Sequence, residues 1–143
     1  MKVLLSIKPE FAEKILNGTK RYEFRKVAFK NQNVTGVVIY ATQPIGMVIG
    51  EFSIEGIMTD SPDRIWQATE QHAGISSDFF NAYYAGCNKA VAIKIGESER
   101  YKQPIGLVDF WPGITPPQSF RYLPPSTQLA QSARQRVGKS FPG

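Results

Sequence analysis

Eight residues near the amino terminus carry the side chains most suited to chemistry in this chain. Residues 18–25 read Gly-Thr-Lys-Arg-Tyr-Glu-Phe-Arg, so a glycine is followed by Lys20, Glu23 and Arg25 in the spacing G-x-K-x-x-E-x-R. A lysine can neutralise an anion, the planar fork of an arginine can hold a phosphate, and a carboxylate can orient both or accept a proton. The charges can also be purely structural, because Glu23 lies between Arg21 and Arg25 and can pair with either. Exposed pairs of this kind contribute only about 0 to 1 kcal/mol, so stability is a weak reason for such a density of charge.

The net charge of the chain is concentrated around this motif. The 143 residues carry 17 basic and 12 acidic side chains, a net charge of +5. Residues 1–30 hold eight of the basic and three of the acidic side chains, so the rest of the chain is balanced at nine and nine. Coulomb attraction to phosphate supplies most of the non-specific affinity for nucleic acids. The sequence therefore predicts a nucleic-acid-binding surface formed by Lys8, Lys20, Arg21, Arg25 and Lys26.

The elements on either side of the motif determine where its side chains point. An apolar run at residues 2–7 predicts a strand, and a proline in the first-turn position opens a helix at residues 9–17. Gly18 suits the left-handed conformation that ends a helix. Residues 21–27 then alternate with period two, which predicts a strand with its charged side chains on one face and its aromatic side chains on the other.

The remaining elements indicate an α+β fold. Further strands are predicted at residues 34–40, 47–57, 90–95 and 119–123, with a polar turn at 97–100. Two helices are predicted after the capping residues Ser61 and Ser76, and the aromatic side chains of the second are expected to belong to the core. Strands at nearly even intervals with inserted helices favour a small mixed or antiparallel sheet, closed into a β-barrel of about five or six strands with flanking helices.

Composition argues against several kinds of site and location. The single cysteine, Cys87, and the single histidine, His72, leave no disulfide and no Cys/His zinc cage, and no metal site is predicted. No glycine-rich loop of nucleotide-binding spacing is present, so no cofactor is predicted. No apolar run approaches the roughly 20 residues that cross a bilayer. A cytoplasmic protein without a membrane partner is expected, and its oligomeric state is left open.

Residues 6–26, from Ser-Ile-Lys-Pro-Glu-Phe to Tyr-Glu-Phe-Arg-Lys, resemble the opening of an ASCH domain, a family related to the PUA RNA-binding fold. The later residues 74–86, 90–95 and 116–123 resemble one branch of that family more loosely. The resemblance implies a PUA-like β-barrel with the motif lysine, glutamate and arginine lining a cleft. It also implies an ASCH/PUA-like domain at residues 1–123, followed by a basic Ser/Gln-rich tail at residues 124–143.

For function, the resemblance implies an RNA-binding module with a basic cleft built around the motif. The alternative that it leaves open is a small hydrolase, in which Lys20 and Glu23 would be the catalytic residues. One branch resembles an amidohydrolase that removes an acetyl group from modified cytidine, but it has a threonine at the place of Glu23, so its mechanism does not transfer unchanged. Other relatives are described as ribonucleases, for which Lys20 and Arg25 would stabilise a pentavalent phosphorane while Glu23 acts as base, or a carboxylate would recruit a divalent ion.

Overall fold

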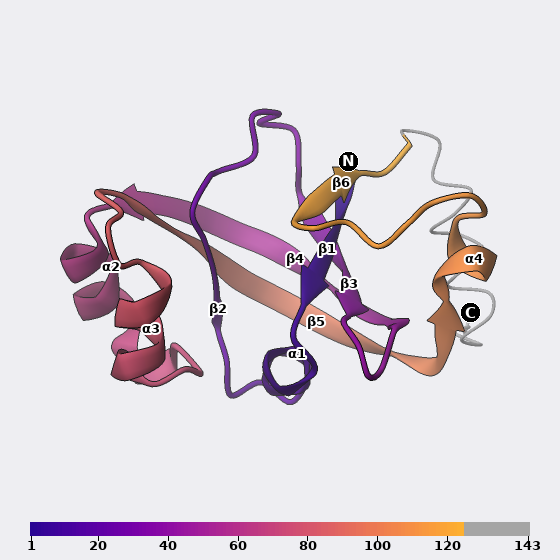
Figure 1. Ribbon diagram of the computed structural model, residues 1–143, viewed down its shortest axis with the longest axis horizontal. Coiled ribbons are helices and arrows are strands. Elements are labelled where there is room, and N and C mark those ends of the chain that lie inside the picture. Colours follow the sequence, from indigo (N-terminus) through magenta and orange to yellow (C-terminus); the bar gives the residue numbers. More distant parts are fainter. Residues whose placement is uncertain (125–143) are drawn as a thin grey trace.

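A mixed six-stranded sheet curls into a half-barrel and organises residues 1–124, the part of the chain that the computed structural model describes (Figure 1). The strand order is β2-β5-β4-β3-β1-β6. The strands are β1 (Lys2–Ile7), β2 (Tyr22–Arg25), β3 (Gly36–Ala41), β4 (Met47–Asp60), β5 (Ala90–Gly106) and β6 (Phe120–Tyr122). The helices are α1 (Pro9–Leu16), α2 (Pro62–Thr69), α3 (Ser77–Tyr83) and α4 (Leu107–Phe110), with a 3₁₀ turn η1 (Glu70–His72) after α2. The predicted α+β class and the curved mixed sheet with flanking helices are confirmed.

The long antiparallel pair β4–β5 forms the spine of the sheet. Figure 1 shows α2 and α3 at one end of this pair and α4 at the other. The predicted polar turn at residues 97–100 is wrong, because these residues continue β5 and pair with β4, as in Glu99 opposite Glu51. Exposure explains the misleading composition, since residues 97–100 are all exposed or half-buried in β5 and polar side chains are accepted there. The predicted strand at 90–95 is thus only the first part of β5.

The amino-terminal unit follows the sequence pattern closely. Pro9 begins α1, whose inner face buries Ala12 and Ile15 against the sheet. Gly18 adopts a φ of +89°, the left-handed conformation that ends the helix without a steric penalty. The chain then enters β2, which pairs with the start of β5 on one side only. The other edge of β2 has no strand partner within the described residues, and this edge faces the site.

Helix α3 divides its aromatic side chains between two environments. Phe80 and Tyr84 are buried in a cluster with Phe24 and Ile65, beneath α2 and β5. Phe79, by contrast, is 36% exposed. The prediction that these aromatic side chains belong to the core therefore holds for Phe80 and Tyr84 and in part for Tyr83, which packs half-buried against the same cluster, but not for Phe79. A helix that lies at the edge of a sheet buries only one side.

Two further predictions from the sequence concern membrane-spanning segments and the carboxyl-terminal tail. No helix within residues 1–124 is both long enough and apolar enough to cross a membrane. The predicted tail at 124–143 lies outside the described residues, apart from its first residue, so the domain boundary at residue 123 stays a prediction.

Gly50 and Gly56, both in β4, provide a matched test of the packing between α1 and the spine. A Cβ added at Gly50 would lie 2.6 Å from the carbonyl oxygen of Glu99 and 2.9 Å from Cδ2 of Leu16, whereas one added at Gly56 would meet nothing within 4 Å. We expect Gly50→Ala to lower the free energy of unfolding by about 1–3 kcal/mol, since overpacking displaces backbone, and Gly56→Ala to change it by less than about 0.5 kcal/mol. Urea unfolding of the two variants measures this, and equal stabilities would contradict the tight approach of β5 at Gly50.

Candidate functional site

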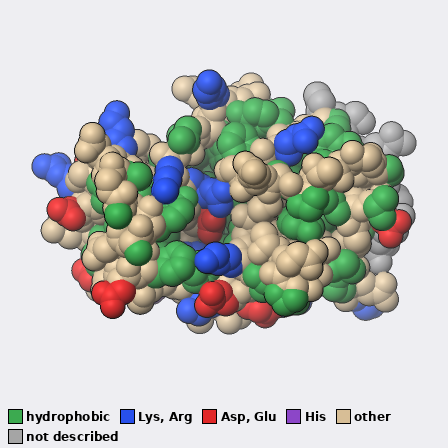
Figure 2. Space-filling model, in the orientation of Figure 1, with side chains coloured by type: hydrophobic (Ala, Val, Ile, Leu, Met, Phe, Trp, Pro, Cys, Tyr) green, Lys and Arg blue, Asp and Glu red, His purple; other side chains and the backbone are tan. Residues whose placement is uncertain are grey.

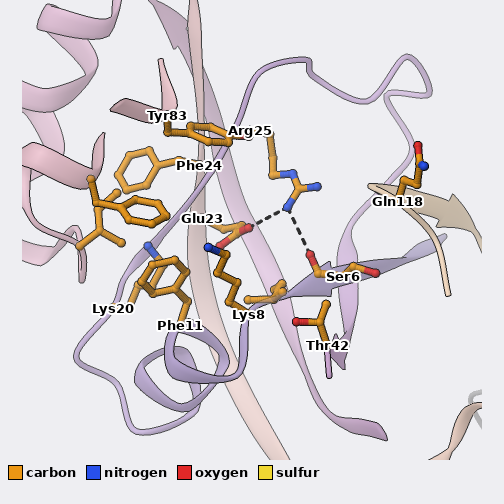
Figure 3. A pocket seen from close by; sticks show the side chains of 13 residues that line it. Ser6, Lys8, Phe11, Lys20, Glu23, Phe24, Arg25, Thr42, Tyr83 and Gln118 are labelled. Carbon is orange, nitrogen blue, oxygen red and sulfur yellow. Dashed lines mark hydrogen bonds and ion pairs between the residues drawn. The ribbon is translucent and has the colours of Figure 1, made fainter. Parts of the chain in front are cut away.

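A cavity of about 400 Å³ lies between the free edge of β2 and the carboxyl ends of β1 and β3. Figure 2 shows this face hollowed near its centre, with Lys and Arg side chains around the hollow and a carboxylate within it. We call this cavity the motif cleft. Its lining residues are Ser6, Ile7, Lys8, Phe11, Lys20, Glu23, Phe24, Arg25, Thr42, Ile75, Phe79, Tyr83 and Gln118. It combines an apolar aromatic side with a cluster of charges, as Figure 3 shows.

Lys20 lies at the floor of the motif cleft and is almost completely buried, at 1% exposure. Its Nζ donates a hydrogen bond of 2.7 Å to the carbonyl oxygen of Ala73 and lies 4.8 Å from the ring centroid of Phe24. Gly74, with a φ of +70°, packs directly on the aliphatic part of Lys20, where any Cβ would lie 2.5 Å from its Cβ and Cγ. Burial lowers the pKa of Lys20 to about 8, although the nearby carboxylate of Glu23 acts in the opposite direction.

Glu23 and Arg25 form an ion pair inside the motif cleft. Glu23 is 5% exposed, and its Oε2 lies 3.0 Å from Nη1 of Arg25. The same guanidinium donates to the carbonyl oxygen of Ser6 at 3.4 Å and to Oγ of Ser119 at 2.8 Å. Because β2 and the opposing edge of the half-barrel do not pair as strands, Arg25 is a polar link across the opening between them. Its planar fork is held in place while one side of it borders the cavity.

Aromatic rings form the wall of the motif cleft opposite β1. Phe11 of α1 contacts Phe79 edge to face, with ring centroids 5.1 Å apart. A lysine ammonium lies over each of the two α3 rings, Lys8 at 5.1 Å from the centroid of Phe79 and Lys26 at 4.9 Å from that of Tyr83. Burial raises the pKa of Tyr83, so this phenol stays neutral over the physiological range.

The structure brings together most of the residues that the sequence singled out. Lys8, Lys20, Glu23 and Arg25 line the motif cleft, and Lys26 lies beside it on the ring of Tyr83. Arg21 is not among the lining residues, since its guanidinium is directed toward the carbonyl oxygen of Ile95 at 3.4 Å. Its place is explained by strand geometry, because Arg21 precedes β2 and lies beside β5 rather than at the free edge. The binding and catalytic roles of all these residues stay predictions.

Sequence reasoning missed the aromatic and hydroxyl-bearing parts of the cleft. The i, i+4 spacing of Phe79 and Tyr83 was visible, but it did not show which face of the helix would meet the core. Ser6, Thr42 and Gln118 gave no signal, because they come from the ends of distant segments. Only the parallel pairing of β1 with β3 brings the first two to the same edge of the sheet.

A second concavity, of about 620 Å³, lies beside β4 and β5 and is less suited to an anion. Three of its lining residues are Glu51, Glu97 and Glu99, and the lysine in its lining, Lys2, is paired with Glu51 at 2.8 Å. Within residues 1–124, no group of three or more His, Cys, Asp or Glu side chains is arranged to hold a metal ion.

The burial of Lys20 predicts how the free energy of unfolding depends on pH. Because the pKa of Lys20 is about 8 in the folded chain and 10.5 ordinarily, the unfolded chain binds more protons between these values, so the Lys20 contribution to stability rises with pH there. We expect the free energy of unfolding of wild type, minus that of Lys20→Met, to rise by about 3 kcal/mol between pH 8 and 10.5. Urea unfolding of both proteins over this range measures it. Curves that stay parallel would show that Lys20 titrates normally in the folded protein.

Comparison with known proteins agrees with this architecture. The family model for the ASCH domain matches residues 5–106. An ASCH domain-containing ribonuclease of Zymomonas mobilis is 30% identical over 123 residues, which cover 84% of this chain and 82% of that protein. The crystal structure of ASCH from Zymomonas mobilis matches with a TM-score of 0.84 and 30% identity, over 92% of this chain and 94% of that one.

A further relative carries a similar segment within a longer protein. The large ribosomal subunit protein uL22 of Ureaplasma parvum is 29% identical over 123 residues, which cover 85% of this chain but 39% of that protein. The family match spans more than half of the chain, and the motif, α1 and the strands β2 to β5 lie in the matched region. This chain belongs to the ASCH domain family.

Proposed function

We propose that this chain binds single-stranded RNA and holds one unpaired nucleotide in the motif cleft. One observation carries the proposal: a single cavity of about 400 Å³ is lined both by three cationic side chains and by an aromatic wall. The volume suits one nucleotide and is too small for a duplex. Proteins recognise single-stranded RNA mainly through splayed bases that stack on aromatic rings, with phosphates held by cations.

The charges of the cleft favour an anionic ligand. Glu23 neutralises one cation at close range through its ion pair with Arg25, which leaves Lys8 and Lys20 in excess. Lys8 is exposed and Arg25 is half-buried, whereas Lys20 is buried, so we assign the phosphate to Lys8 and Arg25, with Lys26 at the next nucleotide. Lys20, at the floor, is placed to donate to a base edge or a sugar oxygen. Arg21 is assigned no contact within the cleft.

The relatives favour a polynucleotide over a free nucleoside. The protein from Zymomonas mobilis with 30% identity is named a ribonuclease, and RNA is the ligand class that its name and this cleft share. A chain that acts on RNA also fits the positive charge of residues 1–30, which extends beyond the cleft and can contact neighbouring phosphates.

The first test removes the two cations assigned to phosphate. We expect Lys8→Gln combined with Arg25→Gln to weaken binding of a labelled single-stranded RNA at least tenfold at low salt. The slope of log affinity against log salt should fall by about 0.7 for each phosphate that the variant no longer neutralises. Fluorescence anisotropy titrations at several salt concentrations give both quantities.

The matched control removes the same charge from β5. Lys94 and Lys102 are exposed and do not line the cleft, so Lys94→Gln combined with Lys102→Gln should bind RNA nearly as wild type does. Equal reductions of affinity in the two double variants would show that only overall charge matters, and an absence of RNA binding by wild type would overturn the proposal.

Ribonuclease activity is the second candidate function, favoured by the 30% identical relative and by the neighbouring Glu23 and Lys20 in the cleft. In this reaction Glu23 takes the proton of the ribose 2′-hydroxyl, and the 2′-oxygen attacks phosphorus. Arg25 holds a non-bridging oxygen of the phosphorane. The bond to the 5′-oxygen breaks, and that oxygen takes a proton from the Lys20 ammonium, whose pKa of about 8 suits it to an acid near neutrality. The products are a 2′,3′-cyclic phosphate and a 5′-hydroxyl.

Glu23→Gln separates binding from catalysis. The amide keeps the size of the side chain but removes a negative charge that faces phosphate, so RNA affinity should stay equal or become slightly tighter. If Glu23 is the base, the same change should slow cleavage by about a hundredfold or more, since positioned proton transfer typically contributes 10²–10⁴. Labelled RNA and acetylated cytidine are incubated with both proteins, with and without Mg²⁺ or Mn²⁺, and product ends are identified.

The outcomes distinguish the three activities. Cleavage by wild type that is abolished in Glu23→Gln and on RNA lacking the 2′-hydroxyl makes the chain a ribonuclease with the roles given above. Binding without turnover leaves an RNA-binding module. Release of acetate from acetylated cytidine, without action on RNA, would contradict both and identify an amidohydrolase.

A further inference from the structure

We propose that Phe79 and Tyr83 of α3 form a stacking platform for two successive bases, one of them the base of the nucleotide held in the motif cleft. Lys8 and Lys26 occupy the two ring faces in the absence of RNA and move to phosphates when bases replace them. This inference rests on the proposed binding of single-stranded RNA and deepens it, because it states how many bases the site takes and what holds them.

The position of the two rings on α3 is the first observation. They are spaced i, i+4, so they lie one above the other on one face of the helix, while Phe80 and Tyr84 are buried in the core and Tyr83 packs half-buried against that cluster. Among the large hydrophobic side chains that are exposed within residues 1–124, Phe79 is the one aromatic. The helix is therefore fixed by its buried face, and the outer rings are held rigidly toward the cleft.

The cover of these rings is the second observation. Phe79 receives the edge of Phe11, at an interplanar angle of 81°, and the ammonium of Lys8 lies over its ring at 5.1 Å from the centroid. Tyr83 is contacted by Tyr84 at 73° and carries Lys26 at 4.9 Å. Each ring is thus packed by another ring and also carries a cation on a flexible stem. An exposed lysine ammonium can move away from the ring with only a small loss of free energy.

Replacement of the ammonium by a base is favourable, because base stacking contributes more to the equilibrium than the cation–π contact does. An exposed ammonium over an aromatic ring contributes roughly 2- to 5-fold in an equilibrium constant. A stacked base contributes roughly 5- to 150-fold in affinity. The nucleotide also brings a phosphate, which attracts the displaced ammonium. Because every base has a π face, the platform should accept any base, and paired bases of a duplex should not reach it.

The test compares RNA that has bases with RNA that lacks them. The probes are a fluorescein-labelled uridine hexanucleotide and an abasic hexanucleotide of the same length, both with methylated 2′-hydroxyls so that neither can be cleaved. We expect wild type to bind the uridine probe at least tenfold more tightly than the abasic one. Phe79→Leu combined with Tyr83→Leu should lower the affinity for the uridine probe at least fivefold and leave the affinity for the abasic probe unchanged.

The control is an aromatic ring with a cation over it outside the cleft. Trp111 carries the guanidinium of Arg121 at 5.6 Å from its ring centroid, so Trp111→Leu should bind both probes as wild type does. Thermal unfolding of each variant checks that it is folded. The single changes Phe79→Leu and Tyr83→Leu serve in place of the double variant if that protein does not fold.

Each outcome decides the inference. Equal affinity of wild type for the two probes would overturn the stacking platform while RNA binding stands. An equal reduction of affinity for both probes in the ring variants would show that the rings only support the fold of the cleft, and would overturn it also. Failure of wild type to bind either probe would overturn the stacking platform together with the proposed function.

Discussion

The ion pair between Glu23 and Arg25 is the interaction on which the site depends. Glu23 is buried, and the guanidinium 3.0 Å away offsets the cost of burying its charge. The same arginine reaches across the opening of the half-barrel to Ser6 and Ser119, so neutralising Glu23 also ties the two sides of the cleft together. Truncation of either side chain should therefore disturb both the electrostatics and the shape of the motif cleft.

Burial of Lys20 and Glu23, with Arg25 half-buried beside them, is a poor way to gain stability in a small protein. Ion pairs taken out of water seldom repay their desolvation, and apolar replacements of similar size are often as stable or more so. Lys20 illustrates the cost, since burial lowers the pKa of its ammonium to about 8. A charge cluster of this kind is more readily understood as a preorganised site, in which folding has already oriented the charges that a ligand will use.

One arrangement of residues supports both candidate functions. Cations around a carboxylate can hold a phosphate, and the same carboxylate can accept a proton from a hydroxyl beside that phosphate. The aromatic wall serves either case, because a base held against rings fixes the position of its ribose and phosphate. Whether the chain cleaves RNA or only binds it then depends on small differences in distance within the cleft, and not on a different set of residues.

The sequence by itself determined the local features of this protein. Three features depend on contacts within a few residues: the helix that begins at Pro9, its end at Gly18 and the alternation of β2. They can therefore be predicted from the order of residues alone. The motif lysine, glutamate and arginine could be named for the same reason. The spacing of the strands and the family resemblance together predicted the curved sheet.

Only the tertiary structure decided what surrounds the motif. Polar residues at 97–100 read as a turn but extend β5, because pairing with β4 outweighs local propensity. Thr42 reaches the cleft through the parallel register of β1 and β3, and Phe79 reaches it because α3 buries its opposite side. These contacts join residues far apart in the chain. Their energies depend on which faces of the helices and strands pack together, and the sequence of one segment alone does not determine this packing.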